Sequence, residues 1–156
     1  MSNEGYLSAL EAALKTHISE ADSSLSPEAT HVITHLDDYI YNFEPNNFPI
    51  VTVRIGKSSN IEAFFGRHLS ATKRGTYITV PFSLTVFHNH STTNSKESLA
   101  MDIADAIKSK LLVSNAKSVG LIRYTNISIE KRVSNLGSVS QAYVEGIIEA
   151  RRAFNA

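Results

Sequence analysis

The feature that most constrains this chain is a long alternating segment in its middle, Thr76–His90. Every second position is apolar, and the apolar set is Ile78, Val80, Phe82, Leu84 and Val86. A strict period of two predicts a β-strand that buries one face in a core. At about 3.3 Å per residue, Thr76–His88 would extend roughly 40 Å, whereas the mean strand has only about five or six residues. We therefore expect this strand to bend or to project beyond its own domain.

A proline lies within the alternating segment. The nitrogen of Pro81 carries no hydrogen and cannot donate a ladder hydrogen bond. The sequence therefore predicts a bulge or an edge position at Pro81.

Two amphipathic helices are predicted outside the alternating segment. The first is Asn3–Ala21, with apolar residues at three- and four-residue spacing: Tyr6, Leu7, Leu10, Ala13, Leu14 and Ile18. The second follows a capping-box pattern from Asn94 to Glu97 and runs to about Leu112. Its apolar face is formed by Leu99, Ile103, Ala104, Ile107 and Leu111.

Further strands are predicted before the alternating segment and after the second helix. Ile50–Ile55 alternates, with Val51, Val53 and Ile55 on one side. Ile61–Leu69 could return as a strand, and Ser70–Gly75 is expected to be a polar, basic loop. The last two strands are Val119–Val133 and Ala142–Phe154, joined by a hairpin loop at Ser134–Gln141. Pro27–Ile40 is ambiguous and could form another helix.

These elements predict one α+β domain spanning residues 1–156. We expect a mostly antiparallel sheet, with the N-terminal helix and the central amphipathic helix packed on one face. A length of 156 residues suits a single compact domain.

Composition excludes several classes of site. The chain has no cysteine, so disulfides, thiolate zinc sites, iron–sulfur clusters and cysteine nucleophiles are ruled out. Fifteen Lys and Arg balance fifteen Asp and Glu, which does not favour bulk attraction to nucleic acid. We expect a soluble protein, because the sequence shows no signal-peptide pattern and no apolar run of membrane-spanning length.

Two pairs of histidines could suggest metal binding. His88-Asn89-His90 places two imidazoles on one side of a strand, but no carboxylate or third ligand is close in sequence. His31 and His35 stand four residues apart without the glutamate of an HExxH motif. We interpret both pairs as polar surface residues and predict no metal site.

A basic segment stands out before the alternating strand. Arg67, His68, Lys73 and Arg74 lie between two glycines, without the GxxxxGK[ST] pattern of a phosphate-binding loop. The plain interpretation is a solvated hairpin tip. The functional one is an interface or lumen loop that contacts an acidic protein surface or DNA phosphates. Arg151 and Arg152 allow the same two interpretations.

No motif for catalysis is present. GxSxG and GxGxxG are absent, and no acidic pair has a context that would bury it. We therefore predict no enzymatic activity, no catalytic residues and no cofactor.

The order of elements resembles the tail terminator, or tail-completion, proteins of tailed phages and related viruses. Three stretches carry the resemblance: GTYITVPFSLTVFHNH at 75–90, LAMDIADAIKSKLL at 99–112, and AYVEGIIEARRAF at 142–154. A short strand ending in Arg-Ile-Gly at 54–56 precedes them. The likeness spans about four-fifths of the chain, although Asp22–Phe48 is longer and more aromatic than in that family.

The resemblance implies a structural virion protein, assembled in the host cytoplasm and located at the head–tail interface. Such proteins form a homo-oligomeric ring, usually a hexamer, on the head-proximal end of the tail tube. The ring stops polymerisation of the tube protein and joins the tail to the head connector. Genomic DNA passes through its lumen without sequence-specific binding, and no membrane takes part.

Other functions remain open from the sequence alone. One is another connector or neck protein of the head–tail joint. A second is an α+β ligand-binding module of ferredoxin-like type. A third is a small metal-dependent nuclease that uses His88 and His90.

Overall fold

The computed structural model describes residues 3–27, 31–34, 49–56, 59–61, 67–68, 73–89, 99–132 and 139–155. The helices are α1 (Asn3–Ala21) and α3 (Leu99–Leu112), with short 3-10 turns η1 (Ser23–Leu25) and η4 (Lys117–Val119). The strands are β1 (Val32–Ile33), β2 (Ile50–Ile55), β3 (Ser59–Ile61), β4 (Arg67–His68), β5 (Lys73–Asn89), β6 (Leu121–Arg132) and β7 (Val139–Asn155). The predicted α+β class is confirmed.

One sheet contains all of these strands, in the order β1-β2-β5-β7-β6. The short strands β3 and β4 add to β5 beyond the end of β2. All pairs are antiparallel except β1 with β2. The predicted central strand is confirmed, but it is longer than expected, because β5 begins at Lys73 and has 17 residues.

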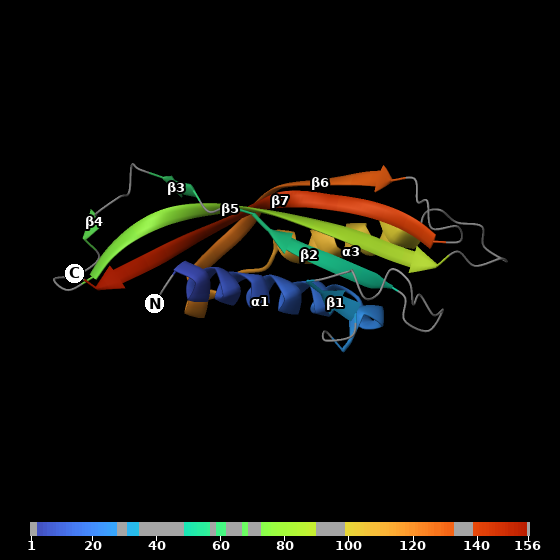
Figure 1. Cartoon of the computed structure of the whole chain (residues 1–156), viewed down its shortest axis with the longest axis horizontal. Helices are drawn as coiled ribbons and strands as arrows, with labels where there is room; N and C mark the ends of the chain where they lie inside the picture. The colour runs from blue at the N-terminus through green and yellow to red at the C-terminus, as the bar shows by residue number, and fades with distance from the viewer. Residues whose placement is uncertain are drawn as a thin grey trace.

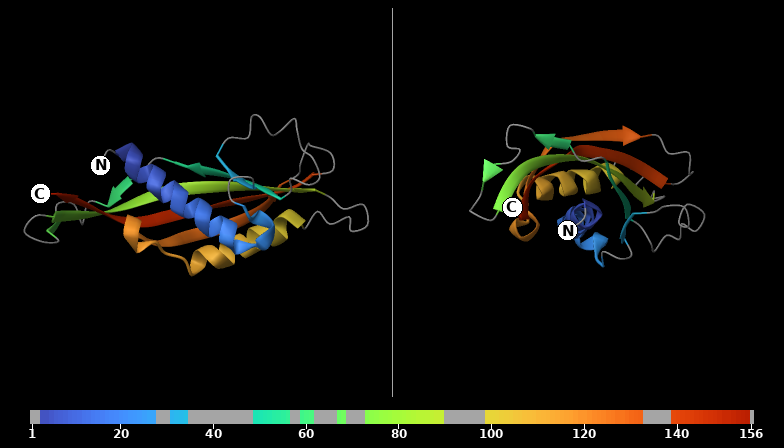
Figure 2. Two further views of the ribbon diagram at one scale, coloured as in Figure 1. Left: turned by 90° about the horizontal axis from the view of Figure 1, so that it is seen from below. Right: turned by 60° about the vertical axis from the view of Figure 1, so that its left-hand side comes forward.

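Both helices cover the same face of this sheet. In the right-hand view of Figure 2 the sheet arches over α3 and α1. Along each strand the side chains alternate between this covered face and the open one. The core lies between the helices and the covered face, and its β5 residues are the predicted Ile78, Val80, Phe82, Leu84 and Val86.

The apolar stripe of α1 explains why this helix docks where it does. Tyr6, Leu10, Leu14 and Ile18 are buried, as the three- and four-residue spacing predicts. In α3 the buried positions are Ala100, Ile103, Ala104, Ile107 and Leu111. Ala100 therefore takes the core position that the sequence assigned to Leu99, which is only half-buried.

Pro81 lies in the interior of the sheet, contrary to the predicted edge position. Its pairing with Ile147 of β7 continues the register without a bulge. On the other side, the carbonyl of Pro81 accepts a hydrogen bond from the Gly56 N–H (2.7 Å), just after β2 ends. Three residues, 56–58, separate β2 from β3, whereas only Val80 and Pro81 separate their partners on β5. The irregularity that the sequence predicts at Pro81 therefore lies between β2 and β3. This position is opposite the Pro81 nitrogen, which has no hydrogen to donate.

Several local predictions are corrected. Val32 and Ile33 form β1 rather than part of a second helix. The proposed single strand Ile61–Leu69 is replaced by β3 and β4. The expected loop at Ser70–Gly75 gives way to β5 from Lys73, and the hairpin loop at Ser134–Gln141 gives way to β7 from Val139. In each case pairing with a neighbouring strand overrides a weak local pattern. The Asn94–Glu97 capping box lies outside the described residues.

A tight packing point joins β5, β6 and β7. Between Thr125 and Ser128, β6 contains a bulge with Asn126 in the left-handed region (φ 54°). Opposite it, Gly146 of β7 faces the ring of Phe82. A Cβ at Gly146 would lie 2.7 Å from Phe82 Cζ and 3.2 Å from Ile127 Cγ1. The absence of a side chain at 146 therefore makes room for the buried aromatic ring.

We expect Phe82→Asp to unfold the domain. Phe82 is 2 % exposed, so the substitution removes a buried ring, worth about 3–5 kcal/mol, and leaves a carboxylate in the core. Urea unfolding followed by circular dichroism measures the effect. The matched control is Thr85→Asp on the open face of the same strand, which should cost no more than about 1 kcal/mol. A folded Phe82→Asp protein would show that the covered face is wrongly assigned.

Gly146→Ala should destabilise the protein by about 1–3 kcal/mol, because the new methyl group overlaps the Phe82 ring. Combining it with Phe82→Leu should recover part of this loss, since a smaller side chain leaves space for the methyl group. A double-mutant cycle in denaturant measures the coupling. Strictly additive effects would contradict the packing described.

Candidate assembly surface

The sheet extends well past the helices at one end. β5 and β7 pair without a register shift from Lys73–Asn155 at one end to Asn89–Val139 at the other. Seventeen paired residues extend roughly 55 Å at about 3.4 Å each. Figure 1 shows the first part of β5 and the last part of β7 continuing beyond the start of α1. We call this projection the arm: residues 73–77 and 151–155, together with β3 and β4.

The arm gathers basic residues from two distant parts of the chain. The predicted set Arg67, His68, Lys73 and Arg74 does not form a loop. Instead, Arg67 pairs with Gly75 and His68 with Arg74 across β4 and β5. On the other side of β5, Arg151 pairs with Tyr77 and Arg152 with Thr76. The pairing of β5 with β7 therefore adds the two C-terminal arginines to the predicted basic segment.

The resulting distribution of charge is uneven. The arm contains five of the fifteen Lys and Arg residues, and its described residues include no Asp or Glu. Outside the arm, the described residues comprise eight Lys or Arg and nine Asp or Glu, which nearly balance. Within the described residues, the excess of basic residues therefore lies in the arm.

The base of the arm is tied to the body at Arg151. Its N–H donates to the carbonyl of Gly120 (2.8 Å), and its carbonyl accepts the Tyr6 hydroxyl (3.4 Å). Gly120 has a φ of 73°, and a Cβ there would collide with the Arg151 carbonyl oxygen. These contacts link the arm to α1 and to the start of β6, and so fix the direction in which it projects.

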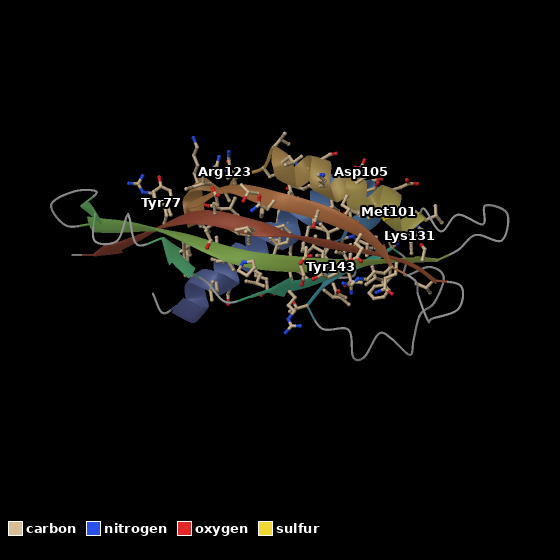
Figure 3. All side chains as sticks on the ribbon, turned by 90° about the horizontal axis from the view of Figure 1, so that it is seen from above. Tyr77, Met101, Asp105, Arg123, Lys131 and Tyr143 are labelled. Carbon is tan, nitrogen blue, oxygen red and sulfur yellow. The ribbon has the colours of Figure 1, made fainter. Side chains whose placement is uncertain are left out.

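The open face of the sheet carries a groove of about 570 Å³ with several polar residues, and a second buried apolar cluster, apart from the main core, is formed by Ile33, Ile50, Phe87 and Val139. Its polar lining includes Thr34, Thr52, Arg54, Thr85, Arg132 and Tyr143. The Arg132 guanidinium lies 3.8 Å from the centre of the Tyr143 ring, and 3.7 Å separates it from the Glu130 carboxylate. Tyr143 is labelled in the view of this face in Figure 3. The groove also contains the Glu11 carboxylate, which accepts a hydrogen bond from the Thr34 hydroxyl (2.8 Å) and lies 3.5 Å from the Lys15 ammonium.

Sequence reasoning missed this groove. Arg54 and Arg132 lie half the length of the chain apart in the sequence, and the order of β2, β5, β7 and β6 brings them to one face. One local pattern did point to it: the alternation of Ile50–Ile55 places Arg54 on the side of the strand opposite Val51, Val53 and Ile55.

Apolar side chains are exposed near the end of α3. Leu112 and Val113 are 57 % and 79 % exposed, and Ile122, at the start of β6, is 39 % exposed. They are close in sequence to η4, which joins α3 to β6. Single exposed apolar side chains are normal on protein surfaces, so these three carry no functional assignment.

A buried polar pair ties α1 to β6. His17 Nδ1 and the Tyr124 hydroxyl are 2.7 Å apart, and the Tyr124 ring contacts Phe82 edge-on. Burial raises the pKa of Tyr124 above its usual range, so the phenol stays protonated and can donate to His17. Burial also lowers the pKa of His17, aided by Lys110 and opposed by Glu20 and a backbone hydrogen bond to Asn115. We assign this pair a structural role.

The histidine pairs of the sequence are only partly described. His88 lies in β5, with its carbonyl accepting the Ser140 hydroxyl (3.2 Å), and His31 Nδ1 lies 2.9 Å from the Pro49 carbonyl. Their companions His90 and His35 fall outside the described residues. Within the ranges that the structure describes, no three His, Asp or Glu side chains gather as a metal site would require.

Comparison with known proteins shows a likeness to solved structures. No protein-family model and no curated protein matches the sequence. The fold is similar to a chain in a solved structure described as the virion of a native gene transfer agent (GTA) particle. The TM-score is 0.51, the sequence identity is 14 %, and the match covers 91 % of this chain and 92 % of that one. The two chains therefore share a fold over nearly their full lengths.

Among the described residues, neither α1 nor α3 combines the length and hydropathy needed to cross a bilayer.

The His17–Tyr124 pair predicts a loss of stability in mild acid. The folded-state pKa of His17 lies below its usual value of 6.5, so the unfolded chain takes up the proton first. This contribution is complete above about pH 6.5 and declines as the pH falls toward the folded-state pKa. Urea unfolding at several pH values should show a smaller decline for His17→Gln than for the wild type. Parallel pH profiles would contradict this role.

Proposed function

We propose that this protein is a structural component of a phage-like virion, and that it acts as a tail terminator. In this role copies of the chain form a ring, a hexamer in the family it resembles, at the head-proximal end of the tail tube. The ring stops addition of tube subunits and presents a surface for the head connector, and DNA passes through its lumen.

The observation that carries this proposal is the shared fold. A chain of the GTA virion structure matches over 91 % of this protein, with neither chain extending far beyond the match. Proteins of one fold can differ in function, so the likeness supports the virion class rather than the individual role. The narrower role rests on the resemblance carried by residues 75–90, 99–112 and 142–154.

The shape of the molecule supports assembly into a ring. A ring requires each copy to contact its neighbour through two different surfaces. The arm reaches beyond the body that carries it, and its hydrogen-bonded β5–β7 pair makes it a firm projection (Figure 1). A projection of this length can contact a neighbour without distorting either core.

A structural rather than catalytic role agrees with the chemistry of the described residues. The open-face groove pairs two arginines with hydroxyl groups, and the buried His17–Tyr124 pair is engaged in packing. In the groove the Thr34 hydroxyl donates to the Glu11 carboxylate, and Glu11 also forms an ion pair with Lys15, which fits a contact that holds α1 beside β1.

Mass and shape in solution test the proposal. We expect light scattering to give about six times the 17.1 kDa of one copy, and negative-stain electron microscopy to show rings. Rings should also cap purified tail tubes. A protein that stays monomeric or dimeric at every concentration and leaves tube ends bare would contradict the proposal.

Particles that lack the protein separate the terminator from a neck connector. Loss of a terminator should yield tails of uncontrolled length, because nothing stops tube growth. Loss of a neck connector should instead leave tails of normal length detached from heads. Detached tails of normal length would therefore show that the protein is a neck connector and not a tail terminator.

A further inference from the structure

We infer that an extended, acidic segment of a partner protein binds in the open-face groove as an extra strand beside β2. The main chain of this segment hydrogen-bonds to the outer edge of β2, and one of its carboxylates pairs with Arg54. The inference goes beyond the proposed function, since neither the ring nor the passage of DNA requires it.

The last three residues of β2 have an unpaired outer edge in the part of the chain that the structure describes. β1 pairs with β2 only as far as Thr52, and no described strand continues beside Val53–Ile55 on that side. The Gly56 N–H donates to the Pro81 carbonyl across the ladder with β5. Because main-chain groups alternate in direction along an antiparallel pair, those of Ile55 point away from β5. Ile55 therefore presents an N–H and a carbonyl at the outer edge.

The groove reaches this edge. Two of its lining residues, Val53 and Ile55, have side chains on the covered face, whereas Arg54 lies on the open face. A groove lined by residues from both faces of one strand extends to the edge of that strand. Glu11 of α1 and Thr34, which follows β1, line its helix side and hydrogen-bond to each other. A volume of about 570 Å³ leaves room for a short extended segment.

The two edges of the sheet differ in how they are protected against added strands. An exposed edge can bind another chain through main-chain hydrogen bonds, and natural proteins block this with bulges and charged side chains. β6, at one edge, has the bulge at Asn126 and the charged residues Arg123 and Glu130–Arg132. β2 pairs with β5 without a register shift and carries one charged residue, Arg54. Strand addition is therefore favoured at β2.

Arg54 determines the charge of the partner. It is exposed, and it forms no ion pair among the described residues. In a pair of strands, residues directly opposite each other have side chains on the same face, so the residue opposite Arg54 meets its guanidinium. A carboxylate at that position accepts charge-assisted hydrogen bonds. Ser83, which pairs with Arg54 on β5, and Thr52 add hydroxyl groups on the same face.

Nucleic acid and a second copy of the chain fit this site less well. Glu145 pairs with Ser83, and Glu130 pairs with Tyr143, so two exposed carboxylates lie beside residues of the groove. These carboxylates repel a row of phosphates but leave space for a single carboxylate at Arg54. The β6 edge of a second copy brings three basic residues and one acidic residue toward Arg54, which is the wrong balance of charge.

Binding of a synthetic peptide tests the site. The probe is Val-Thr-Asp-Thr-Val, labelled with a dye and blocked at both ends, so that its Asp can face Arg54 while its two Thr face the polar helix side. Fluorescence anisotropy should detect binding, and either Arg54→Gln in the protein or Asn for Asp in the peptide should weaken it at least about 10-fold. Hydrogen exchange measured by mass spectrometry should slow in residues 50–56, because the Ile55 N–H gains an acceptor. The matched control is Arg123→Gln, on the same face but paired with Glu149, which should bind the peptide as the wild type does.

The outcomes separate this inference from the proposed function. The inference is overturned if the peptide does not bind, if the Asn peptide binds equally well, or if exchange in residues 50–56 is unchanged. If the peptide does not bind and Arg54→Gln breaks self-association, a second copy occupies the edge. If Arg54→Gln instead abolishes retention of a short DNA duplex, nucleic acid is the partner, and the inference is likewise overturned. Rings and peptide binding are measured separately, so the loss of one leaves the other standing.

Discussion

The ladder between β5 and β7 is the constraint on which the rest of the structure depends. Seventeen residues of each strand pair in one unbroken register, so the two strands behave as a single twisted beam. One part of this strand pair forms the covered face of the sheet, against which α3 and α1 pack. The other part has no helix of the described chain beneath it and becomes the arm. Body and projection are thus two ends of the same hydrogen-bonded element.

Contacts across the helix layer hold this arrangement in place. Lys110 of α3 lies 3.4 Å from Glu20 of α1, and His17 of α1 reaches Tyr124 of β6. At the other end, Tyr6 and Gly120 both contact the backbone of Arg151. An exposed pair such as Lys110–Glu20 contributes little to stability, so the contacts of the buried Tyr124 and of the half-buried Gly120 are the more important restraints.

Periodicity predicted the elements whose apolar pattern was long. The alternation around Phe82 and the helical spacing from Tyr6 to Ile18 both matched the buried residues, because burial on one face is what produces such patterns. Short strands were missed. Arg67–His68 has no pattern of its own and is a strand only because β5 lies beside it. The candidate site was half predicted for the same reason: Arg74 was singled out, but its proximity to Arg152 depends on strand pairing that no local sequence signal encodes.

The place of β7 in the sheet has a consequence for how the protein reaches its native state. β7 follows all the other strands in the chain, yet it lies between β5 and β6. Its neighbours β5 and β6 are synthesised earlier. The edge of each strand that faces β7 therefore stays unpaired until β7 has been synthesised. Such long-range pairing slows folding and leaves strand edges open to other chains. Until β7 pairs, the open edges of β5 and β6 can therefore bind strands of other copies, and fast pairing of β7 protects the new chain from such contacts.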